Sequence, residues 1–161
     1  MDWMPDNQVA VLIQEWERAK AGAEEFINSM PDDKLAFRPV PEVLSFAGQF
    51  LHVADANYRF AAGAFGVESP FQGTKPEDDP TLQSKTALLG FVLASYEFIL
   101  QGLRGLSGTP GSLEAEVPFF RWTMSRRLIL AKALEHHAHH RGQTVVYFRL
   151  QGMKPPSERL F

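Results

Sequence analysis

Apolar residues recur at three- and four-residue spacing in four long segments of this 161-residue chain, and this spacing constrains the fold more than any other feature. It places the apolar side chains of each segment on one face of an α-helix. We expect these helices at about residues 6–29, 43–65, 81–106 and 124–150. Amphipathic helices bury their apolar faces against one another, so the predicted fold is all-α, a single four-helix-bundle domain over residues 1–161.

The connections between the predicted helices differ in length. Residues 66–80 and 107–120 form two long connections, and the second contains a short extended segment at 114–119. Long connections favour a bundle with crossovers over a series of simple helical hairpins. Thr123 is the predicted N-cap of the last helix, which Gly152 and the two prolines after it bring to an end.

Composition excludes several classes of protein. The chain has no cysteine, which excludes disulfides, iron–sulfur clusters, thiolate zinc ligands and a cysteine nucleophile. Its net charge of −3 and its single adjacent pair of arginines argue against a nucleic-acid partner. We find no signal peptide and no apolar stretch long enough to span a membrane. We therefore expect a cytoplasmic protein without a membrane partner.

The last predicted helix is apolar on more than one side. Four apolar residues lie away from the face that holds Ile129 and Tyr147, namely Leu130, Leu134, Val145 and Phe148. A helix that is apolar nearly all round needs covering on all sides. This pattern predicts a homodimer.

Histidine usage points to a metal site. His136 and His140 are four residues apart, so their side chains project from one helical face about one turn apart and can chelate one ion. His52 is the only histidine outside the cluster at 136–140, and small and polar residues surround it in its helix. We expect these three histidines to bind one divalent transition metal, with zinc or nickel favoured and iron or copper as alternatives.

Some neighbouring residues are weaker candidates for roles at this site. Gln143 and Asp55 are candidates for contacts to the metal-binding histidines or to a substrate, and His139 is a weaker candidate of the same kind. His137 points away and is expected to pack. It also occupies the position after the first histidine, where zinc peptidases need a glutamate base, so we reject a peptidase. Packing or surface roles are favoured for Asn57, Tyr58 and Arg59.

The run His136-His137-Ala138-His139-His140-Arg141-Gly142-Gln143, followed by Tyr147, Arg149, Gly152 and Pro155-Pro156, resembles the C-terminal signature of the DinB/YfiT-like superfamily. Residues 51–55 resemble the ligand segment in that family's second helix, and residues 35–39 resemble its first connector. The resemblance implies an up-down-down-up four-helix bundle. It also implies a metal site made by His52, His136 and His140. Dimers are common in that family. Family members include metal-dependent hydrolases and transferases or isomerases that use bacillithiol, mycothiol or glutathione.

These observations leave several functions open. The leading hypothesis is a metal-dependent transferase in which the ion lowers the pKa of a low-molecular-weight thiol, which then attacks a small-molecule electrophile. The second is a hydrolase with metal-activated water, for which Asp55 is the one obvious base. The third is a dimer that binds a metal or ligand without catalysis. The last is a bundle in which the histidines only pack.

Overall fold

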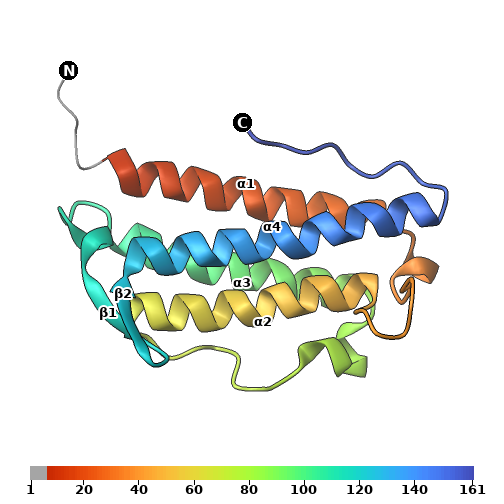
Figure 1. Ribbon diagram of the computed structural model, residues 1–161, viewed down its shortest axis with the longest axis horizontal. Coiled ribbons are helices and arrows are strands. Elements are labelled where there is room, and N and C mark those ends of the chain that lie inside the picture. The colour runs from red at the N-terminus through yellow and green to blue at the C-terminus, as the bar shows by residue number, and fades with distance from the viewer. Residues whose placement is uncertain (1–6) are drawn as a thin grey trace.

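The computed structural model describes residues 7–161, and four helices packed lengthwise make up most of this part of the chain (Figure 1). The helices are α1 (Asn7–Ser29), α2 (Phe46–Phe65), α3 (Lys85–Gly105) and α4 (Arg126–Leu150). Short 3-10 turns lie in the connections, at Asp32–Lys34 (η1), Pro76–Asp78 (η2), Pro80–Leu82 (η3) and Ser112–Glu114 (η4). The predicted all-α four-helix bundle is confirmed.

The helices follow the up-down-down-up order. In Figure 1, α1 and α4 run in one direction and α2 and α3 run in the other. Helix α3 packs against both α1 and α2, and α2 packs against α4. Residues 66–84 run along the length of the bundle and are a true crossover (Figure 1). The second long connection is not a crossover, because α3 ends at the same end of the bundle where α4 begins.

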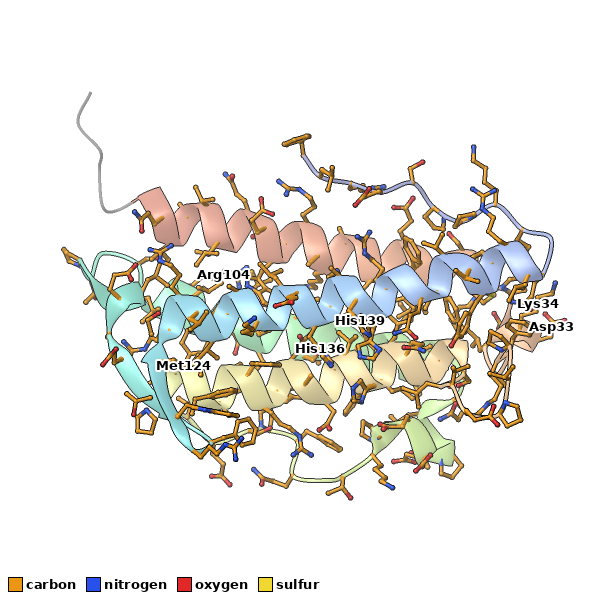
Figure 2. The ribbon with its side chains drawn as sticks, viewed as in Figure 1. Asp33, Lys34, Arg104, Met124, His136 and His139 are labelled. Carbon is orange, nitrogen blue, oxygen red and sulfur yellow. The ribbon has the colours of Figure 1, made fainter. Side chains whose placement is uncertain are left out.

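Serine side chains set the starts of three helices, and these starts fall later than we expected from apolar spacing. Ser45, Ser84 and Ser125 each accept a hydrogen bond from the backbone N–H three residues ahead. Helix α4 therefore begins at Arg126, and the prediction that Thr123 caps it is wrong. Thr123 and Met124 belong instead to a strand at the end of the bundle (Figure 2).

A β-hairpin precedes α4. Strands β1 (Glu116–Phe119) and β2 (Trp122–Ser125) pair antiparallel, with Phe119 opposite Trp122. The extended segment expected at 114–119 thus covers β1, whereas β2 lies where we expected the helix to begin. The reason is the turn, in which Phe120 adopts φ +52° without the glycine or asparagine that marks such turns in a sequence.

Helix α3 buries one of its apolar faces in the core. By length and composition this helix could cross a membrane, although we predicted no such segment. Its largest buried apolar residues face the other helices of the bundle, namely Leu88, Val92, Ile99, Leu100 and Leu103. These buried residues form the contact of α3 with the other helices of the bundle.

The second apolar face of α4 is covered by the chain itself. Leu130 and Phe148 are buried in the core, and Leu134 and Val145 are partly buried against it. These residues therefore do not require a second copy of the protein to cover them. The homodimer stays a prediction.

Candidate metal centre

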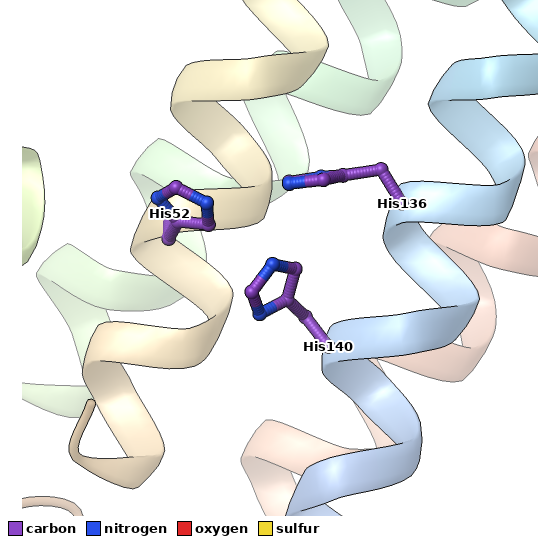
Figure 3. Close-up of side chains that lie close together, drawn as sticks. All are labelled: His52, His136 and His140. Carbon is purple, nitrogen blue, oxygen red and sulfur yellow. The ribbon is translucent and has the colours of Figure 1, made fainter. Parts of the chain in front are cut away.

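Helices α2 and α4 bring the three predicted histidines together. His52 lies in the middle of α2, and His136 and His140 lie one turn apart on the face of α4 that meets it (Figure 3). The ring centroids are 5.1 Å apart for His52 and His136, 4.6 Å for His52 and His140, and 4.5 Å for His136 and His140. One ring nitrogen from each histidine lies within 4.8 Å of the other two.

This arrangement fits a transition metal. Bonds of about 2.0–2.1 Å to imidazole nitrogen place the nitrogens of a tetrahedral site about 3.3 Å apart. The three nitrogens lie within 4.8 Å of one another, so side-chain rotation would bring them to that spacing around an ion. Among residues 7–161, the buried Nδ1 of His136 has no hydrogen-bond partner. The donors are all imidazoles, which suit zinc, nickel, iron and copper.

Burial keeps the two imidazoles of α4 neutral. It lowers the pKa of His136 to about 4, with smaller contributions from the charges of His52 and His139. It lowers the pKa of His140 to about 3, helped by the charges of His136, His52 and His139. Both rings therefore lack a second proton at neutral pH, and each keeps a lone pair that can bind a cation.

The side chain of Gln49, in α2, fixes the orientation of His140. Its Oε1 lies 2.6 Å from His140 Nδ1, and its Nε2 donates to Tyr147 Oη at 2.9 Å and to Gln143 Oε1 at 3.1 Å. Tyr147 in turn donates to the carbonyl of Leu44. Since the amide nitrogen faces two acceptors, Gln49 Oε1 must be the atom that faces His140. His140 Nδ1 is therefore the donor, and its Nε2 lone pair is free.

The role of Gln49 could not be predicted from the sequence, where it is only one of the polar residues near His52 in the same helix. The pattern of one helix does not show which residue of another helix it will meet. The sequence predicts that Gln143 contacts the metal-binding histidines or a substrate. It touches Gln49 and lies two hydrogen bonds from His140. Its contribution is to hold Gln49.

Asp55 and His139 do not join the three imidazoles. Asp55 accepts a hydrogen bond from Arg59 Nε at 3.1 Å, one turn further along α2. His139 is exposed on α4 next to His140, and its ring nitrogens are not among those that converge. Figure 2 shows its position on the same helix as His136. Asp55 and His139 thus remain candidates for substrate contacts only.

His137 packs on the other side of α4, as predicted. The Oη atom of Tyr96 lies 2.5 Å from His137 Nδ1, in a buried contact between α3 and α4. Burial lowers the pKa of His137 to about 3 and raises the pKa of Tyr96. Tyr96 is therefore the proton donor and His137 the neutral acceptor.

Asn57, Tyr58 and Arg59 have the packing and surface roles that the sequence predicts. Asn57 is buried and donates to Ser95, and the ring of Tyr58 packs among aromatic rings of α3 and the crossover. Arg59 is more than half exposed and pairs with Asp55. All three have packing or surface roles.

Two aromatic residues that sequence reasoning missed flank the site on the hairpin side. The ring of Phe60 lies 6.3 Å from that of His136, and Phe119 of β1 stacks on Phe60 at 5.4 Å. Beyond them lies an open cavity of about 420 Å³, whose wall includes Asp55, Arg59 and Phe119. The cavity thus begins about one helical turn from His52.

The fold and the site define a class: an up-down-down-up four-helix bundle with three imidazoles meeting between its second and fourth helices. The sequence matches the model of the DinB superfamily over residues 15–144, which is most of the chain. The protein therefore belongs to the DinB superfamily, whose members typically bind metals, and its histidine triad could hold one.

Solved structures agree with this fold. A DinB-like protein from Bacillus cereus ATCC 10987 superposes with a TM-score of 0.77 at 20% identity, covering 92% of this chain and 95% of that one. A DinB-like protein from Bacillus subtilis, YjoA, superposes with a TM-score of 0.70 at 23% identity, covering 91% and 95%. No protein of curated function matches the chain. At these identities the likeness establishes the fold alone.

Proposed function

We propose that this protein is a metal-dependent transferase that joins a low-molecular-weight thiol to a small electrophile. The convergence of three imidazoles, those of His52, His136 and His140, carries the proposal. Three protein ligands leave coordination positions for exogenous molecules, as in catalytic and unlike structural sites. A bound divalent metal, with zinc or nickel favoured, would supply a positive charge that lowers the pKa of a thiol placed beside it.

The chain's own residues supply the surroundings of that chemistry. Gln49 orients His140, and burial keeps both histidines of α4 free of a second proton. The neighbouring cavity of about 420 Å³ has the size of a small-molecule site. Its aromatic residue Phe119 and its ion pair Asp55–Arg59 offer an apolar wall and polar contacts to an electrophile.

A thiol cofactor suits this chain because the protein has no cysteine of its own. A low-molecular-weight thiol is kept reduced in the cytoplasm, so a cytoplasmic location is part of the proposal. Hydrolysis ranks second. Asp55, the base that the sequence offered for it, is already paired with Arg59 and is not among the groups that converge with the histidines.

The test is conjugation of a chromogenic electrophile by untagged protein loaded with zinc or nickel. Glutathione, bacillithiol and mycothiol are supplied in turn as the thiol. We expect thiol-dependent product that His140→Ala abolishes and His139→Ala retains, since His139 lies outside the convergent group. Equal activity in His140→Ala would overturn the proposal. Turnover of an ester panel without added thiol would favour the hydrolase.

A further inference from the structure

Glu77 brings a carboxylate to the edge of the histidine triad. Its Oε1 lies 3.8 Å from His52 Nδ1, and among residues 7–161 no other carboxylate oxygen pairs within 4 Å with a ring nitrogen of the three histidines. The Glu77 side chain is only 15% exposed, and its Oε2 is buried without a hydrogen-bond partner. A buried carboxylate oxygen without a donor is costly, so this position calls for an explanation.

The crossover between α2 and α3 holds Glu77 in place. Pro76 is buried, and Gln83 Nε2 donates to the carbonyls of Glu77 and Asp79 at 3.2 and 3.0 Å. A Cβ atom built on Gly48 would lie 3.7 Å from Cβ of Glu77. The η2 turn therefore sits directly on the turn of α2 that precedes His52. Glu77 is positioned by packing and hydrogen bonds, and its approach to His52 is part of the fold.

We propose that Glu77 is a positioning residue of the metal centre, which accepts a hydrogen bond from His52 Nδ1–H. This contact would fix the tautomer of His52 and leave its Nε2 lone pair for the metal, as Gln49 does for His140. The separation of 3.8 Å is longer than a hydrogen bond, so the proposal requires the two side chains to rotate toward each other. The inference rests on metal binding at the three histidines.

The charge of Glu77 adds a second effect. Imidazole ligands do not offset the charge of a divalent cation. A buried carboxylate behind one of them lowers the energy of the bound cation. Loss of such a contact typically weakens metal binding about 10- to 100-fold. Glu77→Gln keeps the hydrogen-bond acceptor and loses the charge, so its effect should be smaller than that of Glu77→Ala.

The experiment is a zinc titration of untagged protein against a chromophoric chelator. We compare the wild type with Glu77→Ala, Glu77→Gln and the control Asp78→Ala, which removes an exposed carboxylate from the same turn. We expect Glu77→Ala to bind zinc 10- to 100-fold more weakly, Glu77→Gln to lie between it and the wild type, and Asp78→Ala to match the wild type. Zinc binding by Glu77→Ala as tight as by the wild type would overturn the inference.

A second readout separates this role from a purely structural one. In zinc-loaded protein, nitrogen-15 NMR of the imidazoles should show a protonated Nδ1 on His52 in the wild type and in Glu77→Gln. Nδ1 as the zinc ligand would overturn the inference even if Glu77→Ala fails to fold. A wild type that binds zinc no better than His52→Ala would overturn the metal site itself. Binding that depends on His52 but not on Glu77 would overturn only the role of Glu77.

Discussion

Gln49 Oε1 lies 2.6 Å from His140 Nδ1, and this contact makes a buried residue of α2 responsible for the tautomer of a histidine on α4. Gln49 is itself held by Tyr147 and Gln143, so its amide cannot turn over without losing two hydrogen bonds. The tautomer of His140 that leaves Nε2 free for a cation thus depends on the packing of α2 against α4.

Replacement of Gln49 by alanine should weaken metal binding. We expect Gln49→Ala to lower zinc affinity about 10- to 100-fold, because His140 loses the group that orients it. Gln143→Ala should have a smaller effect, since Gln143 acts on His140 only through Gln49. Chelator competition measures both variants. Equal losses in the two variants would contradict the order of this hydrogen-bonded chain.

Acid should destabilise the metal-stripped protein through His137. Burial lowers its folded-state pKa to about 3, against about 6.5 for an unfolded chain. Between these values the unfolded state binds a proton that the folded state does not, so the free energy of unfolding falls as pH drops below about 6.5. The pKa values of His136 and His140 are lowered too and act in the same direction.

Urea unfolding with a chelator present, at pH 7.5 and pH 5, measures this loss. His137→Asn removes the titrating group while leaving an amide that can accept from Tyr96. The variant should therefore lose less stability between the two pH values than the wild type does. An unchanged difference would mean that His137 is not the group responsible.

The parts of this structure that the sequence predicts are those that repeat along one helix. Apolar spacing predicts the four helices, and the spacing of His136 and His140 places both on one face of α4. Gln49 and Glu77 could not be found this way. Each meets its histidine only after α2 packs against α4 or after the crossover folds back on α2.

The sequence predicts the first strand of the hairpin but not the second, and the reason is local. Its turn uses Phe120 at positive φ, where sequence patterns lead one to expect glycine or asparagine. The residues of the turn and the second strand therefore look, in the sequence, like the apolar start of the last helix. The contact of Phe119 with Phe60 beside His136 depends on the hairpin and could not be predicted without it.

Gly63 should be needed for the hairpin to dock on α2. A Cβ atom at this position would lie 2.7 Å from Cε2 of Phe119, too close for the ring to stay where it is. Gly63→Ala should therefore cost about 1–3 kcal/mol of stability by overpacking and should displace Phe119 from the cavity wall. Gly90→Ala is the control, because that glycine is exposed in α3 and a Cβ there meets nothing within 4 Å.

The control should be stabilised by about 0.5–1 kcal/mol, the ordinary gain when alanine replaces glycine within a helix. Urea unfolding of both variants gives the two values with opposite signs. Equal destabilisation of the two variants would contradict this prediction. It would show that the cost of Gly63→Ala does not come from the contact with Phe119.

Metal should link α2 to α4 and raise the melting temperature of the protein. A cation that binds only the folded chain stabilises it by about 2.7 kcal/mol at a concentration one hundred times its dissociation constant. We expect zinc or nickel to raise the melting temperature of the untagged wild type, and a chelator to reverse the rise. His52→Ala should lose most of this rise, since it removes the sole imidazole that α2 contributes to the triad. His139→Ala should keep it, because that ring is exposed outside the triad. A rise of equal size in His52→Ala would show that the cation binds elsewhere, for instance between His136 and His139, and that the two helices are not bridged.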